Sequence, residues 1–182
     1  GSSKKFQYIG IQLEKIVTRT DKIHSSPTPV NVVLVQPEIP SNTGNIIRLC
    51  ANTGAKLHLI GPLVFELNNS KMRRAGLDYH DLCSFNFHRT WNEFISKENP
   101  LTAKSYAITT RGKTCFYQEN FYKNCWIFFG SETKGLSPEH RSFFMSQNHL
   151  KIPMQSHSRS LNLGNAVAVC VYEIWRQSNF LT

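Results

Sequence analysis

A strand, a helix and a second strand follow one another within about thirty residues, and this order constrains the fold more than any other sequence feature. The short apolar run Val32–Val35 is typical of a strand buried on both faces. Ser41 or Asn42 is expected to cap a helix that ends at Gly54. Leu57–Ile60 predicts the next strand. Units of this kind build parallel sheets, so the sequence predicts an α/β fold.

The same alternation continues to the end of the chain. It predicts a mostly parallel sheet with flanking helices, although such patterns do not give the order of the strands. Ser137 is expected to cap a short helix whose first residue is Pro138. The other expected elements are a helix over 91–97, strands over 106–110, 125–129 and 150–153, and a last helix over about 161–177.

Length and charge suggest one basic domain with an appendage. Of the 182 residues, 1–29 are expected to form an N-terminal extension and 30–182 the folded domain. The extension ends in a cluster of Ser, Pro and Thr, and we interpret it as a tag remnant, an RNA-contacting arm, the remnant of a transit peptide or a disordered segment. The chain has 21 Lys and Arg against 12 Asp and Glu, which favours a polyanionic partner such as a nucleic acid.

Several classes of protein are disfavoured. No run of eighteen apolar residues is present, so we expect no membrane span. The five cysteines are scattered and include no C-x-x-C, which favours reduced thiols and a cytoplasmic location. The histidines lack the spacing of known metal motifs, so we predict no metal and interpret His58 and His149 as strand or surface residues.

Three polar loops follow the ends of expected strands, where ligands bind in open α/β sheets. They span residues 42–48, 129–136 and 158–165, and each alone could be only a turn or a helix cap. The first loop ends at Arg48, which could bind a phosphate with two parallel hydrogen bonds. The second has the glycine spacing of a P-loop, but Leu136 stands where the lysine should be. With no G-x-G-x-x-G or G-x-S-x-G present, we expect a cofactor held mostly by backbone.

These loops resemble those of the SPOUT class of RNA methyltransferases. Within that class the chain is similar to the tRNA wobble-nucleotide 2′-O-methyltransferases of the TrmL (YibK-like) family. The resemblance runs from about residue 31 to about residue 177 and rests on stretches 37–54, 74–79, 129–136, 152–154 and 158–167.

The resemblance implies a fold, a cofactor and an assembly. It implies a trefoil knot in the C-terminal part of the sheet, and a homodimer with an active site shared between subunits and with Tyr172 near the interface. It also implies that S-adenosylmethionine (SAM) binds in the knot and leaves as S-adenosylhomocysteine. The cofactor-binding residues carried over are Ile108, Gly130, Ile152 and Ser160, with Thr109, Met154 and Leu161 nearby.

The resemblance also assigns catalytic positions. Arg48 corresponds to an arginine proposed to take the proton from the ribose 2′-hydroxyl, and Asn42 would hold its loop. Glu132, Ser160 and Asn162 would shape the site. A guanidinium with a pKa above about 12 is a poor base, so we expect Arg48 to position the phosphate and ribose.

The sequence therefore predicts a SAM-dependent enzyme that methylates the ribose of cytidine or uridine 34 in tRNA. One alternative is another tRNA or rRNA ribose 2′-O-methyltransferase of the same fold. A second is a non-catalytic RNA-binding dimer. We expect tRNA as partner and a cytoplasmic location, or an organelle if the extension is a transit-peptide remnant.

Overall fold

The computed structural model describes residues 30–67 and 85–181, which form one parallel sheet covered by helices. The seven strands are paired in the order β3-β2-β1-β6-β4-β7-β5, and every pair is parallel. The prediction of a mostly parallel sheet is confirmed. The strands are β1 (Val30–Val35), β2 (Lys56–Ile60), β3 (Phe85–His88), β4 (Ser105–Ile108), β5 (Thr114–Cys115), β6 (Cys125–Phe129) and β7 (His149–Lys151).

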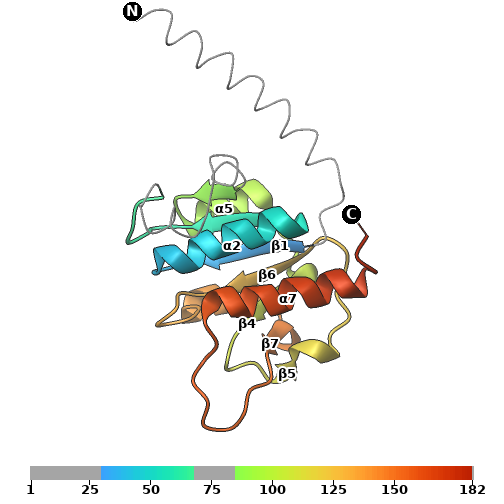
Figure 1. The fold of residues 1–182 in the computed structure, drawn as a ribbon. Coiled ribbons are helices and arrows are strands. Elements are labelled where there is room, and N and C mark those ends of the chain that lie inside the picture. Colours follow the sequence, from blue (N-terminus) through green and yellow to red (C-terminus); the bar gives the residue numbers. More distant parts are fainter. Residues whose placement is uncertain (1–29, 68–84, 182) are drawn as a thin grey trace, which may run out of the picture.

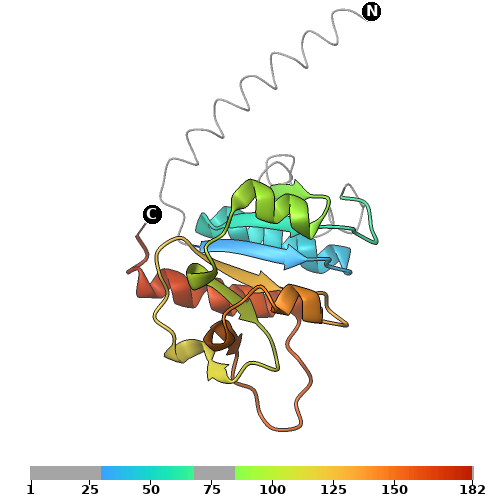
Figure 2. The same cartoon turned by 180° about the vertical axis from the view of Figure 1, so that it is seen from behind.

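Helices cover both faces of this sheet. α2 (Pro40–Thr53) and α7 (Leu163–Gln177) pack side by side over one face (Figure 1). α5 (Trp91–Glu98) and α6 (Pro138–Arg141) lie over the other face (Figure 2). Three short 3-10 helices connect the strands: η1 (Thr102–Lys104), η2 (Phe116–Gln118) and η3 (Ser146–Asn148).

The alternation of side chains along each strand divides the core into two clusters. In β1, Val32 and Leu34 point to the face covered by α2 and α7, where they pack with Val167 of α7. Val33 and Val35 point to the opposite face and pack with Phe94 of α5. A central parallel strand is buried on both faces, which is why β1 reads as a continuous apolar run.

The helix and strand predictions hold for most elements, with corrections at some ends. β6 has the predicted bounds, Gly54 ends α2 in the left-handed conformation, and the Ser137 hydroxyl caps α6 by accepting a hydrogen bond from the His140 amide. The predicted cap of α2 by Ser41 or Asn42 is wrong. The helix starts earlier, at Pro40, and its N-cap residue makes no side-chain cap. The structure also differs from prediction in the bounds of β4, β7 and α7, which are 105–108, 149–151 and 163–177.

Several predictions lie outside the described residues or stay predictions. The extension 1–29, the stretch 74–79 and Cys83 are outside the described part of the chain. The strand order interleaves β6 and β7 with earlier strands, while the trefoil knot itself stays a prediction.

Within the described ranges, Cys50, Cys115, Cys125 and Cys170 are free thiols. None of the helices described there is long and apolar enough to cross a membrane.

A buried histidine pair joins the second and third strands. The Nδ1 atom of His58 lies 3.2 Å from the Nε2 atom of His88, and Phe94 packs edge-on against both rings. Burial, with smaller contributions from His88 and Lys56, lowers the pKa of His58 to about 3. The pKa of His88 is also lowered, mainly by burial, although Glu98 opposes this. We therefore interpret the pair as two neutral imidazoles, one donating its ring N–H to the other.

The same pair and Glu98 bring three atoms that could bind a metal within 4.8 Å of one another, where the sequence predicted no metal site. The Glu98 carboxylate lies 3.9 Å from His58 and 3.7 Å from His88. Metal-binding histidines almost always donate their second ring N–H to an acceptor. Here the second ring nitrogens of His58 and His88 are buried without a hydrogen-bond partner. This arrangement favours the neutral hydrogen-bonded pair.

The histidine pair makes stability depend on pH. Between pH 6.5 and 3 the unfolded chain binds a proton at His58 that the folded protein excludes. The contribution of this group to the free energy of unfolding is therefore fully present above pH 6.5 and is lost as the pH falls toward 3. We expect the free energy of unfolding to fall by about 2 kcal/mol from this group between pH 7.5 and 5. Urea denaturation at both pH values, followed by tryptophan fluorescence, measures this loss.

The variant His58→Leu/His88→Leu should lose this component, whereas the exposed control His157→Gln should retain it. An equal pH dependence in the double variant and the wild type would contradict the interpretation. A melting temperature that falls when EDTA is added would instead identify a bound metal at this pair.

Candidate active site

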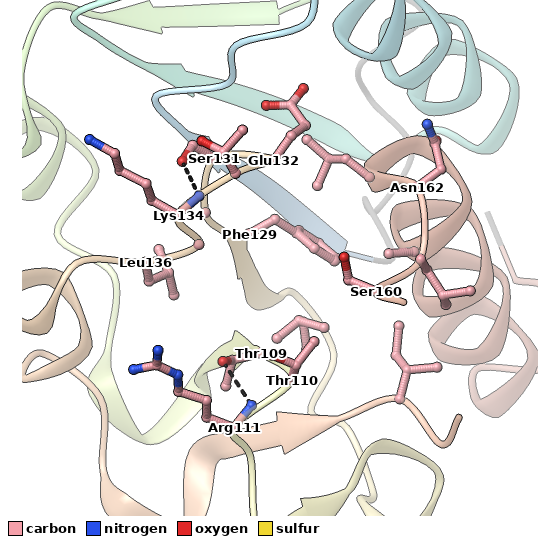
Figure 3. A pocket seen from close by; sticks show the side chains of 18 of the residues that line it. Thr109, Thr110, Arg111, Phe129, Ser131, Glu132, Lys134, Leu136, Ser160 and Asn162 are labelled. Carbon is pink, nitrogen blue, oxygen red and sulfur yellow. Dashed lines mark hydrogen bonds between the residues drawn. The ribbon is translucent and has the colours of Figure 1, made fainter. Parts of the chain in front are cut away.

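The carboxyl ends of the central strands surround one cavity of about 470 Å³. Because all the strands are parallel, the loops that follow β1, β4, β6 and β7 meet at the same edge of the sheet. Residues from all three polar loops line this cavity (Figure 3). Its volume lies within the range of small-molecule sites. The three polar loops therefore converge on one cavity.

The cavity collects the predicted site residues with a single exception. Its apolar wall includes Phe129 and Leu136, and a polar wall carries hydroxyl and amide groups. Arg48 does not line it. The predicted residues that do are Asn42, Ile108, Thr109, Gly130, Glu132, Ile152, Met154, Ser160, Leu161 and Asn162.

The carboxylate of Glu132 ties the loop after β6 to the start of α2. One oxygen accepts a hydrogen bond of 2.7 Å from the backbone N–H of Glu38. The other accepts bonds from the backbone N–H of Ile39, at 3.1 Å, and from the side-chain amide of Asn42, at 3.2 Å. A carboxylate accepts hydrogen bonds only, so it suits a cluster of N–H donors before a helix. Glu132 thus fixes where α2 begins.

Asn42 extends this connection to the third loop. Its side-chain oxygen accepts a bond of 2.9 Å from the Asn162 amide. The Asn162 oxygen caps α7 by accepting from the backbone N–H of Asn165. Asn42 is only 6% exposed, so a side chain unable to bond on both sides would leave buried polar groups unpaired. The chain Glu132–Asn42–Asn162 therefore holds all three loops in one arrangement.

A second bond reinforces the link between the first two loops. The Thr133 hydroxyl donates to the carboxylate of Glu38, and both oxygens lie 2.8 Å away. The motif containing Thr133 was part of the resemblance, but the residue was not among the predicted site residues. Only the folded chain reveals its partner, which lies 95 positions away in the sequence.

Gly130 is required by the fold of its own loop. Ser131 and Gly135 form an antiparallel bridge, and Gly135 has a φ of 66°, in the left-handed region. A Cβ atom added to Gly130 would overlap the backbone of Gly135 and Leu136. The loop is therefore both a tight turn and a wall of the cavity, so the two interpretations of its sequence are compatible.

Arg48 is exposed on the outer face of α2. It follows Asn42 by six residues, which is about 9 Å along the axis and about 120° away around the helix. It has no ion pair or side-chain hydrogen bond among the described residues. The network at the cavity thus includes Asn42, Glu132 and Asn162, while Arg48 lies outside the lining of its own chain's cavity.

Sequence reasoning missed three basic residues that line the cavity. They are Arg111 after β4, Lys134 in the loop after β6, and Arg141 in α6. Arg111 and Lys134 follow strand ends, and this position could have identified them. Arg141 gives no such signal, because its place at the cavity depends on how α6 packs.

Comparisons with known proteins agree with this geometry. Residues 29–172 match the SpoU rRNA methylase family. A tRNA (cytidine(34)-2′-O)-methyltransferase of Burkholderia pseudomallei (strain 1106a) is 53% identical over 150 residues, which cover 82% of this chain and 96% of the relative. The enzyme of that name from Escherichia coli (strain K12) is 44% identical, covering 83% of this chain and 95% of its own.

Solved structures agree as well. One, described as giving structural insights into the 2-OH methylation of C/U34 on tRNA, has a TM-score of 0.73 and 38% identity, and covers 83% of this chain and 97% of its own. The SpoU methyltransferase AviRb from Streptomyces viridochromogenes, in complex with the cofactor AdoMet, has a TM-score of 0.73, covering 85% of this chain and 62% of its own. At 24% identity, that second likeness concerns the fold alone.

The resemblance to SPOUT-class tRNA wobble-nucleotide methyltransferases is confirmed. The family match spans most of the described domain, including all three loops of the cavity. By sequence and by fold, the chain belongs to the SpoU rRNA methylase family.

Proposed function

We propose that this chain is a SAM-dependent methyltransferase that modifies the ribose 2′-hydroxyl of cytidine or uridine 34 in tRNA. The observation that carries the proposal is the convergence of three loops on one cavity, held by Glu132, Asn42 and Asn162. The choice of substrate rests on relatives at 44–53% identity whose names specify cytidine 34, and on the solved structure described as concerning methylation of C/U34.

The cavity suits the proposed cofactor in its chemistry. Ile108, Ile152 and Leu161 offer apolar surface for a flat purine, and the turn at Gly130 brings backbone close. Leu161 lines the cavity and is 41% exposed, so its side chain is accessible to a ligand there. SAM, when bound, supplies an electrophilic methyl group on a sulfonium. We propose that Ser160 and Thr109 complete its polar contacts.

The chain would promote the reaction mainly by positioning. In such a transfer the ribose 2′-oxygen would form a bond to the methyl carbon as the carbon–sulfur bond breaks. The electron pair of that bond would stay on sulfur, and the hydroxyl proton would pass to water. The network of Glu132 and Asn42 fixes the loops around the reacting atoms, so two bound substrates meet in one orientation. We propose that Arg48 holds the RNA phosphate and ribose in this step.

The place of Arg48 outside the cavity supports a homodimer with a shared site. Arg48 is exposed and does not line the cavity of its own chain, so we propose that it serves the cavity of a partner subunit. Exposed apolar side chains on the same side of the sheet supply a contact surface: Tyr172 is 47% exposed and Val169 is 38% exposed on α7. The cytoplasmic location stays a prediction.

Two other functions compete with this proposal. Another ribose 2′-O-methyltransferase of the same fold would use the same cavity on a different RNA. A non-catalytic RNA-binding dimer would not need the complete network of Glu132, Asn42 and Asn162, and the presence of that network favours an enzyme.

Methyl transfer to a short anticodon stem-loop tests the function. We expect radiolabel from SAM to enter RNA with cytidine or uridine at position 34, because the 2′-hydroxyl at that position is the proposed acceptor. The matched control is the same RNA with a 2′-deoxynucleotide at position 34 only, which should accept none. Equal labelling of both RNAs would place the methyl group elsewhere. No labelling of either RNA would contradict the proposed substrate, and SAM binding in calorimetry would then separate an enzyme for another RNA from the non-catalytic alternative.

The variant Glu132→Gln tests the positioning network. An amide places an NH₂ group against the backbone N–H donors of Glu38 and Ile39, so at least one hydrogen bond is lost. We expect kcat to fall about tenfold or more and the free energy of unfolding to fall by about 1–3 kcal/mol. The control Glu139→Gln, on the exposed surface of α6, should change neither. Unchanged kcat in Glu132→Gln would remove this residue from the proposed site.

The variant Arg48→Lys tests the proposed role of the guanidinium. It retains the charge but loses the planar pair of donors, so we expect turnover to fall about 100-fold while SAM binding in calorimetry is unchanged. Arg176→Lys, near the far end of α7, is the matched control. Near-normal turnover in Arg48→Lys would refute the assignment.

Mixed dimers then test which subunit Arg48 serves. One subunit carries Arg48→Lys, and the other carries Met154→Glu, which places a charge in the cavity wall after β7 and should block cofactor binding. If Arg48 acts on the partner's cavity, one intact site forms in each mixed dimer and about half of the wild-type activity returns. If Arg48 acts on its own chain, both sites stay inactive.

A further inference from the structure

Three basic side chains line the cavity without a carboxylate partner among the described residues. Arg111, Lys134 and Arg141 come from three separate segments of the chain, and we call them the basic rim. Figure 3 shows Arg111 and Lys134 on one side of the cavity and Ser160 and Asn162 on the other. In residues 30–67 and 85–181, the ion pairs involve only Glu98 with two histidines and Glu173 with Arg176.

The acidic side chain in the lining does not neutralise the basic rim. Glu132 uses both oxygens to accept bonds from the N–H groups of Glu38, Ile39 and Asn42. Those bonds hold it against the start of α2. The three cations of the rim therefore exceed the one carboxylate of the lining, and the cavity is suited to an anionic ligand.

The backbone that carries the rim is fixed. The N–H of Arg111 donates to the Thr109 hydroxyl, and a Cβ atom added to the next residue, Gly112, would lie 2.6 Å from the Leu150 carbonyl carbon. Lys134 lies inside the bridged turn from Ser131 to Gly135. The backbone of Arg111 and Lys134 is thus held in place before an anion binds, so only the side chains need to be ordered on binding.

Two anionic groups could reach the rim in the proposed reaction: the carboxylate of SAM and a phosphate of the RNA. SAM carries a sulfonium and an ammonium beside its carboxylate, so three cations would repel the rest of the molecule. In RNA, the reacting 2′-hydroxyl is on the carbon next to the one that bears the 3′-phosphodiester. A ribose that brings its 2′-oxygen to the cavity must bring that phosphate as well.

We propose that Arg111, Lys134 and Arg141 bind the 3′-phosphodiester of the nucleotide whose ribose is methylated. This inference rests on the proposed function and identifies the group by which the substrate is held. The contact also affects the chemistry, because a neighbouring phosphate anion raises the pKa of the 2′-hydroxyl. Cations that compensate the phosphate charge ease the loss of the hydroxyl proton as the methyl group is transferred.

Replacing one phosphate charge in the RNA tests this contact directly. An anticodon stem-loop with a neutral methylphosphonate at the 3′ linkage of nucleotide 34 is compared with the unmodified RNA, for the wild type and for Lys134→Ala, Arg141→Ala and Arg111→Ala. We expect each variant to bind unmodified RNA roughly tenfold more weakly, with the salt slope reduced by about one. The methylphosphonate should weaken wild-type binding similarly, and the rim variants should lose much less from it.

Controls separate the contact from general charge effects. Lys56→Ala and Lys123→Ala remove exposed cations at the amino ends of β2 and β6, whereas the cavity lies at the carboxyl ends. They should change RNA affinity less than twofold. A methylphosphonate two linkages away should weaken the wild type and the rim variants equally. SAM affinity, measured by calorimetry, should not fall in any variant.

Two outcomes would overturn the inference. Loss of SAM affinity in the rim variants would assign the anion site to the cofactor carboxylate. Full additivity between the rim variants and the methylphosphonate at the 3′ linkage of nucleotide 34 would show that the rim binds another group. Failure of the proposed function is distinguished from both, because the wild type would then fail to methylate nucleotide 34 in the unmodified RNA.

Discussion

The arrangement of the cavity depends on one partly buried set of hydrogen bonds centred on the carboxylate of Glu132. The helix α2 has no side-chain cap from its own sequence, and the donors just before it bond instead to a residue more than ninety positions away. Asn42 carries the connection on to Asn162, which caps α7. Because both oxygens of Glu132 and the side-chain oxygens of Asn42 and Asn162 accept bonds from these loops, the loops are placed relative to each other before any ligand binds.

The elements that could be predicted from the sequence are those whose local pattern reflects their burial. The β6 strand reads as a continuous apolar run because parallel neighbours and two helical layers cover it. Gly54 marks the end of α2 because few other residues adopt its left-handed conformation. The three loops were predictable as a site, since parallel strands bring their carboxyl ends to one edge. The wrong cap for α2 followed from a local rule, whereas the observed acceptor, Glu132, is distant in sequence.

Other features depend on contacts that no local pattern encodes. The pairing of His58 with His88 requires the register of β2 against β3, and neither histidine has a sequence signal of its own. The strand order, with β6 between β1 and β4, likewise follows from how the chain returns to the sheet. Arg48 was assigned by resemblance, which gives a residue a role but not a place relative to the cavity. Only the structure shows that Arg48 is exposed and does not line the cavity of its own chain.

In the proposed site, charged side chains of one chain and of its partner bind different parts of the ligands. Within one chain, the cavity combines apolar and backbone walls with the three cations of the basic rim. These cations repel the positive charges of SAM, so an anion at the rim would favour binding of the cofactor. The RNA phosphate is such an anion, so each ligand would reduce the electrostatic cost of binding the other. Arg48, pointing outward from α2, would add its positive charge from a second subunit. In this arrangement neither a lone subunit nor a lone cofactor completes the site, and methyl transfer would require the assembled dimer with RNA in place.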